Sequence, residues 1–349
     1  MSWMIYGANG YTGALTAREA VARGMNPVLA GRSADAVREL AGDLGLECRV
    51  FALDDPSAVQ AGLDGMDVVL HCAGPFAHTS APMVDACLAR GTHYLDITGE
   101  IDVFAAAHAR HDEAVRGDVV LLPGAGFDVV PTDCMAASLA AALPAAVSLQ
   151  LAFEAGGGLS PGTATTSLER LPRGGCVRRD GELTQVPLGW KSRTVPFAHA
   201  ERSAVTIPWG DVYTAWVSTG IPDIEVYLSM APAGIRRLRR LRYLQPLLGT
   251  SWMQSFLRRR IEARVRGPDA TRRAQSGSSI WGEARTADGR AISATMTTPN
   301  GYDVTVTASL GIVERLLGGD VEGGYYTPSL LMGADYAAGL PGVDFRLNA

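Results

Sequence analysis

A glycine-rich turn near the N-terminus restricts the fold of this chain more than any other feature. Gly7, Gly10 and Gly13 stand in the sequence Gly-Ala-Asn-Gly-Tyr-Thr-Gly, after an apolar run that begins at Trp3 and before a segment of helical spacing. In that context the first glycine permits a tight turn, the second lets the backbone approach a pyrophosphate, and the third allows close packing of helix on strand. The free N–H groups of the helix N-terminus then face the phosphates. The motif therefore predicts a dinucleotide-binding Rossmann unit.

Short β-branched apolar runs alternate with longer segments of helical spacing over roughly the first 140 residues, the pattern of βαβ units on a parallel sheet. The expected strands are Trp3–Ala8, Pro27–Ala30, Arg49–Leu53, Val68–Cys72, Tyr94–Ile97 and Val119–Leu122. The expected helices include Thr12–Arg23, Ala34–Leu44, Ala81–Arg90 and Val103–Arg116. Six strands fill a doubly wound sheet.

The pattern changes from Val147 onward to Thr- and Val-rich stretches that alternate and are separated by Gly and Pro, which indicates a mainly antiparallel sheet. The expected strands here are Val147–Phe153, Ala204–Ile207, Ile224–Leu228 and Tyr302–Ala308. We therefore expect an α/β fold with a Rossmann domain over residues 1–143 and a second α+β domain over residues 144–324.

Length and composition bound the class of protein. A chain of 349 residues suits two domains, and 47% hydrophobic with 19% charged residues is typical of a globular protein with a sizeable core. A net charge of -5 gives no general attraction to nucleic acid, and we expect no nucleic-acid partner. The five cysteines include no Cys-x-x-Cys pair, so we expect reduced thiols and no metal site. The apolar run at Trp3 leaves no room for a signal peptide, which favours a cytoplasmic protein.

The choice of cofactor depends on the residues after the second strand. An NAD-preferring site places a carboxylate there against the ribose 2′-OH, whereas this chain has Arg32 and Ser33. A guanidinium suits a 2′-phosphate, so the sequence predicts NADP(H). The alternative is that Arg32 points to solvent and that Asp54, after the third strand, is a turn residue rather than an adenine contact.

A stretch of small residues, Cys72-Ala-Gly-Pro75, lies at the end of the fourth strand, at the edge where ligands bind in open α/β sheets. Its backbone would pass beside the nicotinamide ribose, and Cys72 is interpreted as a small strand residue rather than a reactive thiol. The full set of expected cofactor contacts is Gly7, Ala8, Asn9, Gly10, Tyr11, Thr12, Gly13, Arg32, Ser33, Asp54, Cys72, Ala73, Gly74, Pro75 and Phe76.

Several motifs together resemble the saccharopine dehydrogenase-like oxidoreductases, in the branch that contains the eukaryotic saccharopine dehydrogenase-like protein and the bacterial trans-acting enoyl reductases. Besides the glycine turn, the motifs are Ala73–Phe76, Tyr94-Leu-Asp-Ile-Thr-Gly-Glu100, Gly124-Ala-Gly-Phe-Asp-Val-Val-Pro-Thr-Asp133, Gly162-Thr163, Pro208-Trp-Gly-Asp211 and Gly323-Gly-Tyr-Tyr-Thr-Pro328. The resemblance implies that residues 325–349, with a helix over Pro328–Leu340, return to complete the nucleotide domain. It also implies that the second domain holds the substrate and forms a dimer, and that the reaction is an NADP(H)-linked reduction of a C=C or C=N bond.

The protein itself must position the acceptor and supply a proton, because the nicotinamide carries the hydride. No Tyr-x-x-x-Lys pair is present, and Lys191 is the only lysine in the sequence. Asp128, after the sixth strand, is the first candidate for a general acid and Glu100 the second. Capping a helix is the alternative role for Asp128, and a helix-start or turn role for Glu100. The candidate substrate contacts are Phe127, Thr163, Trp190, Lys191 and Trp209.

An arginine-rich segment of helical spacing, residues 235–273, carries twelve arginines. Between Ile235 and Arg266 its spacing is that of an amphipathic helix with a basic face. This helix is either a solvated dimer or surface helix, or a contact with an anionic membrane or an acyl-carrier partner. Two functions remain open for the whole protein: an NADPH-dependent reductase of a small or biosynthetic substrate, or an NADP(H)-binding regulatory or scaffold protein without turnover.

Overall fold

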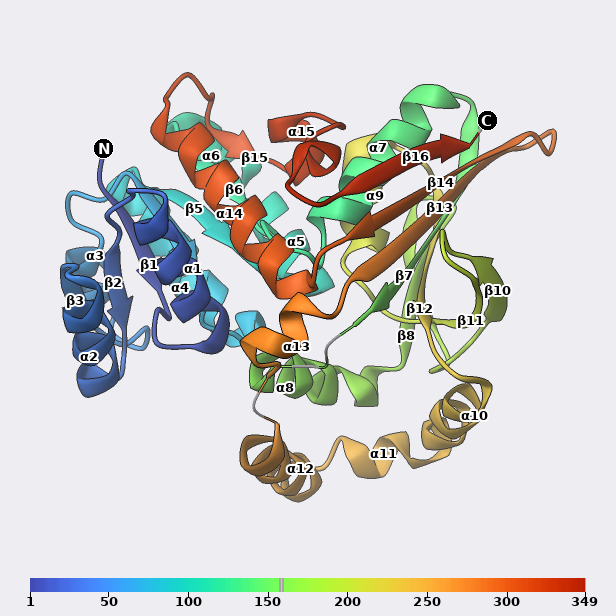
Figure 1. Ribbon diagram of the computed structural model, residues 1–349, viewed down its shortest axis with the longest axis horizontal. Helices are drawn as coiled ribbons and strands as arrows, with labels where there is room; N and C mark the ends of the chain where they lie inside the picture. Colours follow the sequence, from blue (N-terminus) through green and yellow to red (C-terminus); the bar gives the residue numbers. More distant parts are fainter. Residues whose placement is uncertain (157, 159, 266, 349) are drawn as a thin grey trace. The chain divides into compact units, whose positions relative to one another are not determined.

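The computed structural model describes residues 1–156, 158, 160–265 and 267–348, and their contacts divide the chain into two units. The first unit comprises Met1–Val130 and Tyr302–Met332, and the second comprises Pro131–Gly301 and Gly333–Ala349. Each unit is built around its own sheet (Figure 1). The described residues contain no helix that is both long and apolar enough to cross a membrane.

The sheet of the first unit is parallel throughout and has seven strands in the order β15-β6-β5-β4-β1-β2-β3. Its strands are β1 (Trp3–Tyr6), β2 (Val28–Gly31), β3 (Cys48–Val50), β4 (Val68–His71), β5 (His93–Asp96), β6 (Val120–Leu122) and β15 (Gly324–Tyr325). Its helices are α1 (Tyr11–Ala22), α2 (Ala34–Leu44), α3 (Pro56–Gly62), α4 (Phe76–Arg90), α5 (Ile101–His108), α6 (His111–Gly117), α14 (Gly301–Leu317) and α15 (Pro328–Met332). The predicted Rossmann sheet is confirmed, with β15 as an additional edge strand.

Both faces of this sheet are buried, as a parallel sheet requires. Met4, Tyr6 and Val69 pack with apolar residues of α3 and α4 in one core cluster. Their neighbours in sequence, such as Ile5 and Leu70, point to the opposite face and are fully buried as well. This two-sided burial explains why these strands are continuous apolar runs.

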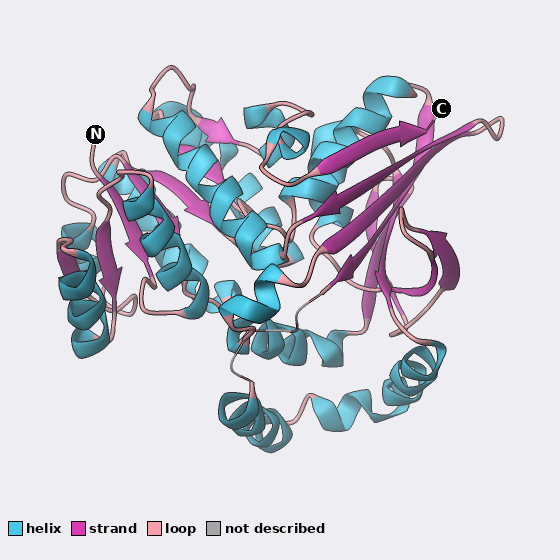
Figure 2. Ribbon diagram, viewed as in Figure 1, coloured by secondary structure: helices cyan, strands magenta, loops and turns pink. Residues whose placement is uncertain are grey.

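The second unit is built on a mixed, mainly antiparallel sheet with the main order β10-β11-β12-β7-β13-β14-β16 (Figure 2). Its strands are β7 (Ala146–Ala155), β8 (Gly175–Arg179), β9 (Glu182–Val186), β10 (Ser192–Pro196), β11 (Glu201–Thr206), β12 (Asp223–Ser229), β13 (Ser278–Thr286), β14 (Ala291–Thr298) and β16 (Asp344–Asn348). Only β7 and β12 pair in parallel. Its helices are α7 (Val130–Ala142), α8 (Pro161–Arg170), α9 (Asp211–Thr219), α10 (Pro232–Leu241), α11 (Gln245–Leu248), α12 (Ser251–Arg264) and α13 (Ala270–Ala274).

The strand expected at Tyr302–Ala308 is wrong, because these residues lie in helix α14. The alternating valines Val304 and Val306 suggested a strand, but the buried positions continue to Leu316 with helical spacing. A seven-residue window of β-branched residues was too short to show this longer period.

The boundaries between the units also differ from the expectation. The chain leaves the first unit at Val130 and not at residue 143, because Met135 and Leu139 of α7 pack against Gly282 of β13. The helix expected over Pro328–Leu340 is interrupted after Met332 by Gly333, whose φ is +93°. The chain then forms β16, which pairs antiparallel with β14 of the second sheet. Residues 302–332, rather than residues 325–349, therefore complete the nucleotide unit.

Candidate nucleotide-binding site

Strand β1 lies between β2 and β4, so the order of the strands reverses there. In open α/β sheets, ligands bind beyond the carboxyl ends of the strands at such a position. The three strands end in register, because Tyr6 lies opposite both Ala30 and His71. The backbone N–H of Gly7 donates to Ala30 O at 2.8 Å, and that of Cys72 donates to Tyr6 O at 2.7 Å. The sequence motifs that follow these strands are therefore brought together at one edge of the sheet.

The glycine turn has no space for side chains at its first and last glycines. Gly7 has a φ of +79°, and a Cβ atom on it would lie 2.8 Å from the backbone nitrogen of Ala73. A Cβ atom on Gly13 would lie 2.3 Å from Gly7 O and 2.9 Å from Ala8 Cα. Helix α1 is thus in direct backbone contact with the turn, as the motif predicts.

The first turn of α1 offers N–H groups to a ligand. Gly10 occupies the N-cap position and provides no side-chain hydrogen bond, and no acidic residue lies in the first turn. The N–H groups of Thr12 and Gly13 are among those that a helix cannot satisfy within itself. They are suited to bind a pyrophosphate.

The end of β2 provides the exposed side chains of Arg32 and Ser33. Gly31 lies against the Asn9 side chain, where a Cβ atom would be 3.1 Å from Asn9 Oδ1, so this end of β2 borders the glycine turn. Burial raises the pKa of the Tyr6 hydroxyl to about 12. The positive charge of Arg32 opposes this rise, and the negative charge of Asp54 adds to it. The two predicted adenosine contacts therefore lie near the same side chain.

Replacing Arg32 by alanine is expected to weaken NADPH binding by about 1–3 kcal/mol, the range for a hydrogen bond to a charged group. The affinity for NADH should change little, because NADH has no 2′-phosphate. Titration calorimetry with both cofactors measures the difference, and equal losses for NADPH and NADH would contradict the assignment.

The loop after β4 is held by its own polar contacts. The Thr79 hydroxyl donates to Ala73 O at 2.7 Å and lies 3.0 Å from His71 Nε2. Burial lowers the pKa of His71 to about 3, so this imidazole is neutral at physiological pH. Burial, together with the charge of Asp96, raises the pKa of Cys72 to about 12, so this thiol is inert.

Glu100 holds the beginning of α4. Its carboxylate accepts the N–H groups of Phe76 at 2.8 Å and Ala77 at 3.1 Å, and its own N–H donates to Thr98 Oγ1. Glu100 is itself buried. These bonds fix the Gly74–Pro75 turn that was predicted to pass beside the nicotinamide ribose.

Replacing Glu100 by alanine should lower the free energy of unfolding by about 1–3 kcal/mol, because two N–H groups lose their acceptor. Glutamine keeps one acceptor oxygen and should restore most of that loss. Urea unfolding of the two variants checks this, and equal stability of Glu100→Ala and the original protein would contradict the anchoring role.

Asp96 joins the loops after β5 and β6. Its carboxylate accepts from the Thr98 N–H and the Gly124 N–H, each at 2.9 Å, and from the Tyr94 hydroxyl at 2.7 Å. Burial raises the pKa of Asp96 to about 7, against the effect of these hydrogen bonds. Its donors are backbone and core groups, which indicates a structural role.

Asp128 is the remaining carboxyl group at this edge. Its side chain lies beside Gly99, where a Cβ atom would be 3.1 Å from Asp128 Oδ2, and it is half-buried. Burial, with a smaller contribution from the charge of Glu100, raises its pKa to about 7. Phe127, the preceding residue, is also half-buried, and its N–H donates to Thr305 Oγ1 at 3.0 Å. A carboxyl group with this pKa can donate a proton near neutral pH.

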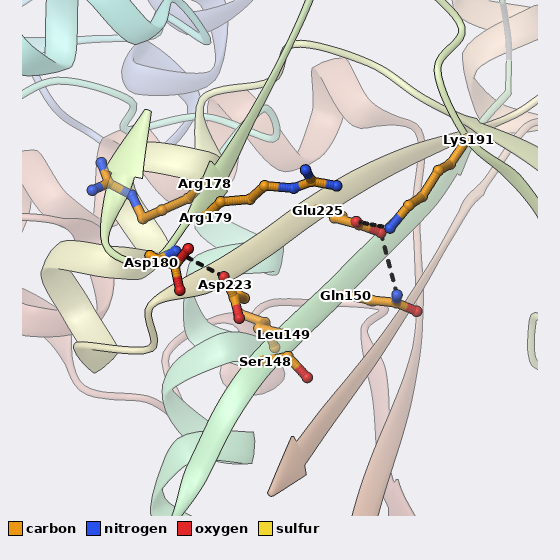
Figure 3. A pocket seen from close by; sticks show the side chains of 9 residues that line it. All are labelled: Ser148, Leu149, Gln150, Arg178, Arg179, Asp180, Lys191, Asp223 and Glu225. Atoms are coloured by element: carbon orange, nitrogen blue, oxygen red, sulfur yellow. Dashed lines mark hydrogen bonds and ion pairs between the residues drawn. The ribbon is translucent and has the colours of Figure 1, made fainter. Parts of the chain in front are cut away.

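The second unit contains a polar pocket of about 440 Å³ on the face of its sheet (Figure 3). Lys191 lines this pocket and forms an ion pair with Glu225, and Trp190 stacks under the Arg179 guanidinium at 4.3 Å. Of the five residues predicted to contact the substrate, Lys191 alone is among the residues that line this pocket. Thr163 lies in the first turn of α8, where its N–H donates to Ser160 Oγ, and Trp209 packs on Phe153 with ring centroids 4.9 Å apart.

The sequence analysis did not identify most residues of this pocket. The residues missed are Ser148, Leu149, Gln150, Arg178, Arg179, Asp180, Asp223 and Glu225. The polar positions alternate with apolar ones along β7 and β12, so one polar sheet face could have been inferred from the strands already predicted.

The strand order, the glycine turn and the open helix N-terminus define the first unit as a Rossmann-type dinucleotide-binding domain. Residues 3–122 match the family model of the saccharopine dehydrogenase NADP binding domain. The predicted resemblance to the saccharopine dehydrogenase-like proteins is confirmed for this part of the chain, and so is the predicted NADP(H)-binding domain.

Curated relatives share this part of the chain. A trans-acting enoyl reductase of Mycobacterium leprae is 34% identical over 142 residues, which are 37% of this chain and 33% of that protein. A saccharopine dehydrogenase-like oxidoreductase of Mus musculus is 32% identical over 150 residues, 37% of this chain and 35% of that protein. The matched region thus spans about a third of each relative's length.

Solved structures extend the likeness to the whole chain. Apo saccharopine dehydrogenase (L-Glu forming) from Saccharomyces cerevisiae matches over 100% of both chains with a TM-score of 0.70 at 12% identity. Homospermidine synthase from Legionella pneumophila matches over 99% of this chain and 91% of its own with a TM-score of 0.63 at 10% identity. At these identities the likeness establishes the fold, and it confirms the predicted α/β architecture with a second sheet domain.

Proposed function

We propose that this protein is an NADPH-dependent reductase that transfers a hydride to the C=C bond of an enoyl group or the C=N bond of an imine. The substrate would be small or biosynthetic, and the site of action cytoplasmic. The observation that carries the proposal is Asp128, a carboxyl group with a pKa of about 7 at the edge of the sheet that carries the nucleotide turn. The names of the relatives, an enoyl reductase and an oxidoreductase, support the same class of reaction.

Different residues of the first unit bind different parts of the cofactor. The N–H groups of Thr12 and Gly13 bind the pyrophosphate, and Arg32 with Ser33 binds the 2′-phosphate. The backbone of Ala73–Pro75, held in place by Glu100 and Thr79, supports the nicotinamide ribose. NADPH, when bound, supplies the hydride.

Asp128 supplies the proton that balances the hydride. As the hydride reaches one atom of the double bond, the other atom gains electron density and takes the proton from the Asp128 carboxyl group, which solvent then protonates again. The pKa of about 7 leaves a large fraction of Asp128 protonated at neutral pH. Asp96 and Glu100 accept backbone N–H groups, and we assign them structural roles.

Trp190 and Lys191 are proposed contacts for a polar part of the substrate, because they border a pocket with both cationic and acidic side chains. Thr163 and Trp209 remain predictions as substrate contacts, and so does Phe127. A homodimer formed through the second unit is part of the same proposal, and light scattering of the purified protein would test it.

The proposal is tested with NADPH that carries deuterium at the transferable position. The full chain is incubated with a 2-enoyl thioester and, separately, with a cyclic imine, and the products are analysed by mass spectrometry. Transfer of one deuterium to either acceptor, faster with NADPH than with NADH, is the expected result. A protein that binds NADPH but transfers deuterium to neither acceptor would instead fit the alternative, an NADP(H)-binding regulatory or scaffold protein.

A further inference from the structure

The segment from α10 to α12 exposes large apolar side chains. Twelve such side chains are exposed among the described residues, and five of them fall between Tyr243 and Phe256. These five include the exposed aromatic rings of Tyr243, Trp252 and Phe256, which are 77%, 59% and 50% exposed. Scattered single exposed apolar residues are ordinary, but a concentration of this kind marks an interaction surface.

Other side chains of the same segment are bonded to neighbouring parts of the second unit. The segment is therefore folded against that unit, and its exposed side chains do not belong to an unfolded loop. The Arg239 side chain donates to Gly189 O at 2.8 Å and Gln254 donates to Leu168 O at 3.3 Å. Arg258 pairs with Glu169 of α8 at 2.6 Å. Helices α10, α11 and α12 follow one another along this unit (Figure 1), and the rings of Tyr243, Trp252 and Phe256 are exposed.

Arginines lie on both sides of the apolar group. Arg236, Arg237 and Arg240 are exposed on α10, and Arg259, Arg260 and Arg264 are exposed on α12. On α12, Trp252 and Phe256 are four residues apart, and Arg259 and Arg260 continue the same helical face. We name residues 232–264 the arginine arm. Arg266, which ends the segment predicted from the sequence, lies outside the described residues.

The charge of the arginine arm is opposite to that of the whole chain. Residues 232–264 contain nine arginines and a single acidic residue, Glu262, in a protein whose net charge is -5. A second copy of this chain is a poor partner for the arginine arm. A two-fold symmetric contact would place the arms of the two copies against each other and bring like charges together. The partner that binds the arginine arm must therefore be anionic and must accept aromatic rings.

We propose that the arginine arm binds the surface of an anionic phospholipid bilayer. Trp252 and Phe256 enter the headgroup region, and the arginines on α10 and α12 bind lipid phosphates. Exposed Trp and Phe side chains next to exposed arginines suit a segment that lies in the membrane interface and binds anionic lipids. Tyr and Trp prefer that depth because their rings are both apolar and polar. The proposal does not depend on the reductase activity.

The test is flotation of the full chain with vesicles of phosphatidylcholine alone and with vesicles of equimolar phosphatidylcholine and phosphatidylglycerol. The protein should float with the anionic vesicles and remain behind with the neutral ones. Each arginine near an anionic surface contributes about 1 kcal/mol, so the triple change of Arg236, Arg237 and Arg240 to Gln should lower the partition coefficient about 100-fold. The double change of Trp252 and Phe256 to Ser should lower it about tenfold or more.

A matched control keeps the net charge change equal. Changing Arg18, Arg116 and Arg290 to Gln removes three exposed arginines from other elements and should leave flotation unchanged. Trp252→Phe should still float but should lose the blue shift of tryptophan fluorescence that vesicles cause in the original protein. Circular dichroism spectra establish that each variant is folded.

Several results would overturn the proposal. Failure of the folded protein to float with anionic vesicles would do so directly, and so would equal flotation of the Trp252 and Phe256 double variant. Binding to soluble polyglutamate without binding to vesicles would point to an acidic protein partner. A dimer in sedimentation velocity that the double variant abolishes, and that does not bind vesicles, would point to a second copy of the chain.

Discussion

Asp128→Asn is expected to lower kcat by about 10²–10⁴-fold with little change in the affinity for NADPH, because asparagine cannot donate the proton that accompanies the hydride. Asparagine has nearly the same shape as aspartate, and it caps helices about equally well. A residue that only stabilised the start of α7 would therefore tolerate this change with stability altered by a few tenths of a kcal/mol. Steady-state kinetics, with the acceptor identified by deuterium transfer, measure the loss of kcat. A thermal unfolding curve of the same variant measures its stability, and the two measurements together separate a proton donor from a helix cap.

The pH dependence gives a second readout. The pKa of Asp128 is raised to about 7, so the carboxyl group is protonated below that pH and ionised above it. A reaction that needs the protonated form should keep its rate at acidic pH and lose it as the pH rises through about 7. Asp128→Asn should remove this descending limb of the pH–rate profile, that is, the loss of rate above a pH of about 7. Glu100→Gln should move it to lower pH, because the charge of Glu100 helps to raise the pKa of Asp128. A limb that persists in Asp128→Asn would assign the titration to another group.

Gly13→Ala is expected to weaken NADPH binding about 100-fold and to destabilise the first unit by about 1–3 kcal/mol, the usual cost of overpacking. The new Cβ atom would lie 2.3 Å from Gly7 O and 2.9 Å from Ala8 Cα, and both neighbours are backbone atoms that cannot rotate away. The turn and the first turn of α1 must separate, which displaces the N–H groups proposed to bind the pyrophosphate. Cofactor titration and urea unfolding measure the two effects.

Gly42→Ala provides the matched control. Gly42 lies in α2, its conformation is ordinary, and no atom lies within 4 Å of the position of its Cβ. Alanine should stabilise this helix by roughly 0.5–1 kcal/mol, because glycine loses more backbone entropy on folding. If Gly13→Ala bound NADPH as tightly as Gly42→Ala does, the close backbone contact at Gly13 would not be needed for the site.

The nucleotide unit could be predicted because its signals are local. The glycine turn, the strand before it and the helix after it are adjacent in the sequence, and the backbone contacts at Gly7 and Gly13 follow from residue type. Arg32 could be placed for the same reason, since it comes directly after β2.

Other features depend on residues that are far apart in the sequence. Glu100 meets the N–H groups of Phe76 and Ala77 only because β4 and β5 are neighbours, so its anchoring role could not be recognised from Glu100 alone. The position of β16 depends on its pairing with β14, which no local pattern encodes. The helix α14 was missed because its valines fit a strand in a short window, and only its full length shows helical burial.

The pairing of β15 with β6 has a consequence for the order in which this protein can mature. Gly324 lies opposite Val120, so the outer edge of the nucleotide sheet stays open until about two hundred further residues have left the ribosome. Closing such a long loop costs little more than closing a loop of half the length, about 0.6 kcal/mol, so the delay is set by synthesis rather than by entropy. During that interval the nascent chain exposes an unpaired strand edge, the kind of surface that chaperones protect. The first unit can complete its sheet once β15 has emerged, whereas the second unit, most of which is synthesised earlier, can complete its own only when β16 follows.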